Sequence, residues 1–368
     1  TPRFAFLRPA GVEDALMTLT APVLDAAMAK HILITGAEKR MALEKAAARV
    51  SATFRTQVQT HSALEPHGCV VEPDGDGGFT VWASTQGTSA FQGSMAQALG
   101  VPVSRVRLIT EHMGGGFGAK LGGIDEWDRA AAVFARELGR SVKTMLDRRA
   151  EHLVAGCRPD SIQEMTLCAD ADGRITALVG SQTGTPGNST RGAGAANTRV
   201  YEIPNLHMEQ GGVATFTGRA RAFRAPGHPQ GMFALEGIVD ALAVAMDIDP
   251  LEMRLRNDPH PLRREQARLG AERIGWQRKR REYPGAFGPR GTLRRGVGYG
   301  AAIWYQKGRG SWVVDLSVAR DGSVTVANAV QDIGTGTRTV LAVLVAEELG
   351  IAPEDVTVRI GDTRDPAG

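Results

Sequence analysis

The residues with the clearest chemical potential form the glycine-rich segment Glu111–Lys120. Glycine adopts positive φ without penalty and lets a ligand approach the backbone closely. Successive exposed N–H groups in such a turn form a concave site for an anion or an oxo group. A strand-like alternation at 103–109 precedes the segment, and a helical pattern follows it from about Glu126. The segment therefore predicts a strand-to-helix loop that either binds a polar ligand or forms only a tight structural turn.

Two common phosphate-binding motifs are excluded at this loop. A P-loop requires a glycine directly before a lysine that is followed by Ser or Thr. Here Ala119 precedes Lys120, and Leu121 follows it. The dinucleotide fingerprint G-x-G-x-x-G cannot be placed within residues 114–121 either. The expected ligand is therefore of another kind.

Three further loops place hydrogen-bond donors at the ends of expected elements. Ser84–Gln86 ends a strand, Arg221–Gln230 precedes a helix, and Gln331–Thr337 lies between a strand and a helix. Free N–H groups and the helix dipole favour anions at such positions. Together the four loops predict a large, phosphate-bearing ligand that is bound from several sides. A mononucleotide would need fewer binding loops.

The composition narrows the class of protein. With 368 residues, 42% of them hydrophobic, the chain can form a large core and two or three domains. Its net charge of +3 does not suggest binding to nucleic acid. Cys69, Cys157 and Cys168 show no C-x-x-C spacing, which argues against an iron–sulfur cluster, a zinc site or a disulfide scaffold in this chain. No apolar run is long enough to cross a bilayer, and no signal peptide opens the sequence.

The elements that must position the loops alternate without a regular βαβ rhythm, so we expect the α+β class. Strand patterns occur at 53–58, 68–72, 79–84, 103–109, 312–319, 324–330 and 356–360. Helical patterns occur at 88–99, 127–138, 233–246, 250–256 and 339–349. Residues 257–295 are unusually basic. We expect them to form a solvated linker or surface loop, with docking to an acidic partner as the alternative.

Several ordered motifs together resemble one family. His61–Gly68, Phe79–Lys120, Tyr201–Asp240 and Gln331–Gly361 look like the large, molybdopterin-binding subunit of the xanthine dehydrogenase/aldehyde oxidase family of molybdenum hydroxylases. The likeness is greatest to the bacterial three-subunit aldehyde oxidoreductases. It implies a partial molybdenum-hydroxylase fold with mixed sheets and flanking helices.

The resemblance covers about residues 50–368 and implies a domain plan. Residues 51–256 match the first molybdopterin-binding domain, 257–295 a basic linker and 296–368 the start of the second domain. Residues 1–50 are atypical, and the segment Phe4–Pro9 resembles the start of the family's flavin-binding subunit. We therefore expect a chain that is truncated, fused or composite, and no flavin in it, because no flavin phosphate loop is present.

The resemblance also implies a molybdenum–molybdopterin cofactor in its cytosine dinucleotide form, with the metal held by the pterin dithiolene and by no protein side chain. Gln86 matches an amide donor toward the apical oxo group of the metal, with a strand-end cap as its ordinary alternative. Arg224 matches an arginine that contacts the pterin end. The two glycine loops supply the remaining cofactor-binding positions, Gly115, Gly116, Phe117, Gly118, Gly334, Thr335 and Gly336.

The substrate pocket departs from the family pattern. Leu121 stands where xanthine enzymes carry a glutamate, and Pro226 stands where an aromatic residue is frequent. Trp304 or Tyr305 could supply aromatic packing instead. These departures favour an aromatic or aliphatic aldehyde over a purine.

The reaction implied by the family is oxidative hydroxylation with water, in which electrons pass to an iron–sulfur subunit and an FAD-binding subunit. A glutamate acts as the general base in the family, and we expect its motif downstream of Gly368. The implied location is the bacterial cytoplasm, or the periplasm after export with a partner. The alternative function is a non-catalytic scaffold or assembly fragment. A plain nucleotide-binding protein is a third alternative.

Overall fold

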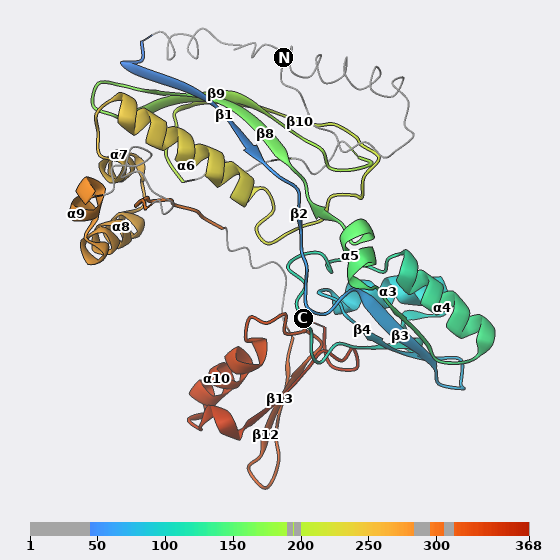
Figure 1. The fold of residues 1–368 in the computed structure, drawn as a ribbon. Coiled ribbons are helices and arrows are strands. Elements are labelled where there is room, and N and C mark those ends of the chain that lie inside the picture. The colour runs from blue at the N-terminus through green and yellow to red at the C-terminus, as the bar shows by residue number, and fades with distance from the viewer. Residues whose placement is uncertain (1–44, 190–193, 195–199, 283–294, 305–312, 368) are drawn as a thin grey trace, which may run out of the picture. The chain divides into compact units, whose positions relative to one another are not determined.

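Figure 1 shows the chain as a computed structural model that describes residues 45–189, 194, 200–282, 295–304 and 313–367. The chain divides into two compact units, each built from discontinuous segments. Unit 1 comprises Thr1–Gln57, Pro159–Thr217 and Ala225–Trp304, and unit 2 comprises Val58–Arg158, Gly218–Arg224 and Tyr305–Gly368. Both combine mixed sheets with flanking helices, which confirms the expected α+β class. Residues 1–44, which include the flavin-subunit-like motif, lie outside the described ranges.

Unit 1 is built on one four-stranded sheet in the order β1 (Ala48–Thr56), β8 (Ser161–Ala169), β9 (Ile175–Gly184) and β10 (Asn205–Gly212). β1 pairs with β8 and β8 with β9 in antiparallel fashion, whereas β10 runs parallel to β9. Helix α6 (His228–Ala245) lies along one face of this sheet (Figure 1). The core of the unit therefore forms between α6 and the sheet, where Leu167, Leu178, Leu235 and Ile238 are fully buried.

Further helices follow α6 in unit 1. Asp249 caps α7 (Pro250–Asn257), because its carboxylate accepts a hydrogen bond from Leu251 N at 2.8 Å. The basic stretch, expected to be a linker or surface loop, instead forms α8 (Pro261–Ile274) and α9 (Trp276–Glu282). Proline at the first position of α8 and a left-handed glycine after its last residue are helix-boundary signals, and they define these helices despite the high charge.

Unit 2 contains a second four-stranded sheet, in the order β5 (Val106–Ile109), β4 (Phe79–Ala83), β3 (Gly68–Pro73) and β6 (Val142–Met145). Helices α3 (Thr88–Leu99) and α4 (Glu126–Leu138) contribute Phe91, Met95, Ala131 and Ala135 to its core. Short strands β2 (Gln59–Thr60) and β7 (Cys157–Arg158) pair beside helix α5 (Arg148–Val154). The glycine-rich segment joins β5 to α4, as the sequence predicts.

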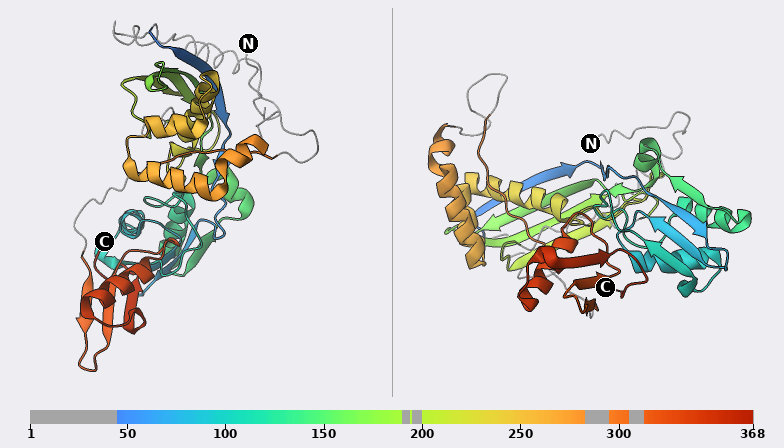
Figure 2. Two further views of the ribbon diagram at one scale, coloured as in Figure 1. Left: turned by 90° about the vertical axis from the view of Figure 1, so that its left-hand side faces the viewer. Right: turned by 90° about the horizontal axis from the view of Figure 1, so that it is seen from below.

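A smaller sheet completes unit 2. Its order is β11 (Asp315–Val318), β12 (Val324–Asn328) and β13 (Val356–Ile360), and α10 (Thr337–Leu349) packs on it (Figure 2). Hydrogen bonds connect this part of the unit to the larger sheet, among them those from Thr88 Oγ1 to Ala329 O at 2.9 Å and from Thr110 N to Gly361 O at 2.6 Å. The loop before α10 is thereby held near the elements that carry the other candidate loops of unit 2.

Within the described ranges, the helices are too short or too polar for a membrane-spanning segment.

Candidate cofactor site

The glycine-rich loop has the backbone geometry that its composition predicts. Gly115 and Gly118 have φ of +95° and +102°, and even Phe117 has a positive φ of +54°. A Cβ atom at Gly118 would lie 2.5 Å from the carbonyl oxygen of Ala222. Glycine is therefore required at position 118 both for its conformation and for the close approach of the segment that precedes α6.

Gln86 is fixed against this loop by its side-chain oxygen. Oε1 accepts hydrogen bonds from Gly118 N at 2.7 Å and from Lys120 N at 3.3 Å. Because both partners are N–H donors, the amide must present its oxygen to them, and Nε2 points elsewhere. No acceptor for Nε2 is found within the described part of the chain. The side chain of Gln86 is therefore pre-oriented beside the glycine loop, and the donor role that the resemblance implies for it stays a prediction.

Arg224 lies beside the same loop. Its backbone N–H donates to Phe117 O at 2.7 Å, and its side chain is exposed. The structure therefore brings together Gln86, the 115–118 loop and Arg224, which the resemblance assigns to one ligand.

The fourth loop, Gln331–Thr337, is hydrogen-bonded to Gln86, but its own backbone N–H groups bond a carboxylate of the same loop. Gln331 Nε2 donates to Gln86 O at 2.5 Å. The N–H groups of Gly334, Thr335 and Gly336 all point at Asp332 Oδ1, at 2.9, 3.0 and 3.1 Å. Burial would raise the pKa of Asp332, but these N–H groups lower it below its usual range. The anion held by this loop is thus the chain's own carboxylate, and a phosphate there would compete with Asp332.

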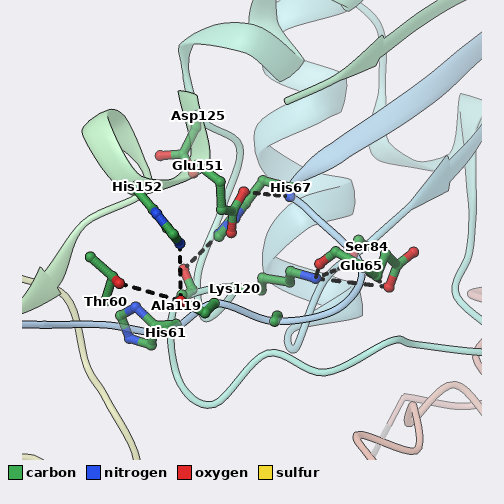
Figure 3. A network of polar contacts seen from close by, with 12 residues as sticks. Thr60, His61, Glu65, His67, Ser84, Ala119, Lys120, Asp125, Glu151 and His152 are labelled. Carbon is green, nitrogen blue, oxygen red and sulfur yellow. Dashed lines mark hydrogen bonds and ion pairs between the residues drawn. The ribbon is translucent and has the colours of Figure 1, made fainter. Parts of the chain in front are cut away.

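A polar network that includes Glu65, Ser84 and Lys120 holds the glycine loop (Figure 3). Lys120 Nζ donates to Glu65 O at 2.6 Å and to Ser84 Oγ at 2.7 Å. Glu65 Oε2 accepts from Ser84 Oγ at 2.8 Å and from Gly114 N at 2.7 Å. Burial lowers the pKa of Lys120, and the Glu65 carboxylate opposes that shift. The network ties the two ends of the loop, at 114 and 120, to one lysine and one glutamate.

Two histidines of the 61–68 motif hold neighbouring segments. His67 Nδ1 lies 2.8 Å from Glu151 Oε1, and its Nε2 lies 3.3 Å from Ala119 O (Figure 3). His61 Nε2 donates to Ala222 O at 2.7 Å, and burial lowers the pKa of His61. No role for these histidines or for Lys120 was predicted from the sequence. The sequence signal that could have indicated this network is the combination of His, Glu and Lys with small residues around a glycine loop.

A small polar cavity adjoins this network and is lined in part by His67, Lys120 and Asp128. Asp128 Oδ2 accepts from Asp125 N at 3.0 Å at the start of α4. Its Oδ1 is buried and has no partner among the described residues. Burial raises the pKa of Asp128 to about 6. This carboxyl group is therefore poorly solvated and only partly hydrogen-bonded.

The candidate substrate-pocket residues belong to different units of the chain, and their role in a pocket stays a prediction. Leu121 belongs to unit 2 and its side chain is exposed. Pro226 and Trp304 belong to unit 1, where Trp304 makes an edge contact with His228 at 4.9 Å between ring centroids. Tyr305 lies outside the described residues. Among the residues that the structure describes, no group of three or more His, Cys, Asp or Glu side chains could hold a metal ion.

Comparison with known proteins gives the same assignment as the motifs. Two family models, both described as "Molybdopterin cofactor-binding domain", match residues 25–258 and 269–367. The aldehyde oxidoreductase molybdenum-binding subunit PaoC of Escherichia coli K12 is 35% identical over 344 residues, which are 88% of this chain and 46% of PaoC. The xanthine dehydrogenase molybdenum-binding subunit of Escherichia coli O157:H7 is 29% identical, over 94% of this chain and 49% of that protein. The chain thus spans about half the length of these relatives.

Solved structures share the fold. The aldehyde oxidoreductase of Desulfovibrio gigas aligns with a TM-score of 0.74 at 24% identity, over 89% of this chain and 38% of its own. Quinoline 2-oxidoreductase of Pseudomonas putida 86 aligns with a TM-score of 0.73 at 22% identity, over 89% of this chain and 46% of its own. The fold and the matched domains agree with the family that the motifs resemble. The chain therefore belongs to the family of molybdopterin-binding subunits that includes the aldehyde oxidoreductases and xanthine dehydrogenases.

Proposed function

We propose that this protein is the molybdenum-cofactor-binding subunit of an oxidoreductase that hydroxylates aldehydes, or related heterocycles, to acids with water. Electrons would leave to iron–sulfur and FAD-binding partner subunits. The single observation that carries the proposal is the arrangement of Gln86, whose oxygen is held by Gly118 and Lys120 while Nε2 remains available beside Arg224's contact with Phe117.

Different residues of unit 2 would contact different parts of the molybdopterin cofactor. When bound, the molybdopterin cofactor supplies the oxygen-transfer and two-electron chemistry. Gln86 Nε2 would donate a hydrogen bond to an oxygen at the metal, and the glycines at 115–118 let the group approach the backbone. The exposed Arg224 guanidinium would bind the pterin end. Lys120 and Glu65 hold the ends of the loop in place, and no residue of this chain is assigned as the general base.

The cofactor form and the substrate class are finer parts of the same proposal. We infer the cytosine dinucleotide form, because the motifs resemble the bacterial three-subunit branch. The Gly334–Gly336 loop would meet the pyrophosphate only if that group displaced the Asp332 carboxylate from its N–H groups. We infer an aldehyde substrate because Leu121 offers an apolar side chain where a glutamate would bind a purine.

Metal and nucleotide analysis tests the proposal directly. The protein, produced with its co-purifying partners in a host that makes the cofactor, should contain about one molybdenum per chain and release a pterin and cytidine monophosphate after acid hydrolysis. It should oxidise benzaldehyde or an aliphatic aldehyde faster than xanthine. A protein that lacks molybdenum yet still binds its partners would favour the scaffold function. Binding of ATP or NAD without molybdenum would indicate a plain nucleotide-binding protein.

A further inference from the structure

Arg158 is a buried cation without an acidic partner among the described residues. It ends β7 and is only 6% exposed. Its guanidinium donates to three neutral acceptors, Gln59 Oε1 at 3.3 Å, Phe223 O at 2.8 Å and Arg224 O at 2.7 Å. No Asp or Glu pairs with it within the described ranges, and burial lowers its pKa. A buried charge is costly unless it is paired, so an unpaired arginine at this position calls for a specific role.

The acceptors of Arg158 lie in the segment that carries Arg224. One nitrogen, Nη2, bonds both the Phe223 and the Arg224 carbonyl oxygens. The guanidinium carbon also lies 4.6 Å from the centroid of the Phe223 ring. That ring stacks on His61 at 4.4 Å between centroids, and His61 Nε2 bonds the preceding carbonyl at Ala222. Three consecutive carbonyl groups are therefore fixed by only two side chains.

Fixing these carbonyls also sets the two loops of the candidate site against each other. The segment begins where Arg221 N donates to Cys157 O at 2.8 Å, directly before Arg158 in β7. It ends where Arg224 N donates to Phe117 O at 2.7 Å, in the glycine loop. Because a Cβ at Gly118 would meet Ala222 O, the fit between the segment and the loop tolerates little displacement. A guanidinium has the planar geometry for this arrangement, whereas a lysine ammonium cannot combine two carbonyl bonds with ring stacking in the same way.

We propose that Arg158 is a positioning residue for the cofactor, which fixes residues 222–224 against the Phe117–Gly118 loop through its paired carbonyl bonds and its stacking on Phe223. This inference rests on the proposed function, because the loops so positioned are those assigned to the molybdopterin cofactor. The unbalanced positive charge of Arg158 additionally favours an anionic ligand in unit 2.

The test compares cofactor retention in the assembled protein carrying Arg158→Lys or Arg158→Met. Molybdenum loss is followed by metal analysis during dialysis in mild urea, at a concentration where circular dichroism shows each variant to be folded. Arg158→Met should release molybdenum at least about tenfold faster than the wild type, a ratio that corresponds to one charge-assisted hydrogen bond. Arg158→Lys keeps the charge and should release it at an intermediate rate.

A matched control separates positioning from general stability. Arg254→Lys alters a buried arginine of unit 1 and should lower the unfolding midpoint while leaving the molybdenum loss rate of the folded protein unchanged. If Arg158→Met fails to fold, the rate of molybdenum loss from Arg158→Lys tests the positioning role. Wild-type retention by either folded Arg158 variant would overturn the positioning role while leaving the proposed function intact. A wild-type protein without molybdenum would overturn both.

Discussion

Arg254 in unit 1 and Arg158 in unit 2 are both buried, but their charges are balanced in different ways. Arg254, 2% exposed, donates to Glu236 Oε2 and Asp240 Oδ1, both at 2.7 Å. Burial alone would lower its pKa, but the Glu236 carboxylate raises it. Among the described residues, Arg158 has only carbonyl and amide oxygens as acceptors, and burial lowers its pKa. Unit 1 thus neutralises its buried cation internally, whereas unit 2 keeps a net positive group next to its ligand loops.

The contrast extends to the packing around the two arginines. Arg254 sits among the helices that cover the large core of unit 1, where Tyr201 also bonds Glu236 at 2.7 Å. Arg158 sits beside loops with positive φ at Phe117 and Gly118. The positive φ of the non-glycine residue Phe117 costs free energy, and such strained residues cluster where a ligand is held. We therefore expect substitutions at Arg254 to affect mainly stability, and substitutions beside the unit 2 loops to affect mainly ligand binding.

The largest expected effect is on stability, at Arg254. Arg254→Met leaves Glu236 without its cation and should lower the free energy of unfolding by about 3–5 kcal/mol, as for other broken buried ion pairs. Urea denaturation followed by circular dichroism measures this change. Molybdenum content per folded chain should not fall. A drop in cofactor content without a loss of stability would reverse the roles given to the two units.

The next effect is expected at Gly118, where both conformation and space require glycine. Gly118→Ala should cost about 2–3 kcal/mol of stability and most of the bound molybdenum, because the new methyl group meets Ala222 O at a φ of +102°. Gly122→Ala is the control, since Gly122 has a similar φ of +99° but no atom within 4 Å of the added Cβ. Equal molybdenum loss in the two variants would show that the close approach to residue 222 is unimportant.

A third effect is expected in the pH dependence of stability, at Asp128. Its pKa is raised to about 6 by burial, so the folded state binds a proton that the unfolded state has already released. Its contribution to stability is therefore complete below about pH 4 and is lost as the pH rises through 6. Asp128→Asn removes this pH-dependent loss. The difference in free energy of unfolding between the variant and the wild type should therefore be about 2 kcal/mol more favourable to the variant at pH 7.5 than at pH 4.

Asp74→Asn is a control of opposite sign for that titration. The N–H groups of Asp76 and Gly78 lower the pKa of the exposed Asp74. Stability from Asp74 is therefore present at neutral pH and lost in acid. Stability curves from urea denaturation at both pH values distinguish the two variants, and a difference of the same sign would contradict the assignment for Asp128.

The smallest expected effect concerns the ring beneath Arg158. Phe223→Leu removes the cation–π and His61 stacking contacts but leaves both carbonyl bonds, so we expect about 1 kcal/mol of lost stability and a modest increase in the molybdenum loss rate. Phe233→Leu in unit 1 removes the edge contact with Phe54 and should affect stability only. Faster cofactor loss in Phe233→Leu than in Phe223→Leu would contradict the comparison.

The sequence predicted the parts of the site that depend on backbone freedom. The positive φ of Gly115 and Gly118 could be predicted because glycine adopts that conformation most readily, whereas Gln86 was singled out only through the resemblance. Arg158 could not be predicted, because its acceptors are carbonyl groups more than sixty residues away in the chain. The hydrogen bonds from three backbone N–H groups to the Asp332 carboxylate were also not predicted. Sequence alone does not show whether a carboxylate of the chain or a ligand accepts from such a turn.

The fold was predicted in class and in most of its helices. Helix α3 at Thr88–Leu99 ends at a left-handed Gly100, as the C-cap signal indicated. The prediction of a linker or surface loop was wrong for residues 261–282, because the helix-boundary signals at Pro261 and Gly275 were not given weight. Within the basic stretch, Arg263 pairs with Asp258 at 2.6 Å and Arg278 with Glu282 at 2.6 Å, so part of its positive charge is balanced.

The most direct test of the central claim is to locate the metal in the assembled protein by anomalous diffraction at the molybdenum edge. We predict one molybdenum in unit 2, beside the 115–118 loop, with Gln86 Nε2 within hydrogen-bond distance of an oxygen on the metal. A molybdenum atom bound elsewhere, or Gln86 facing no part of the cofactor, would contradict this claim.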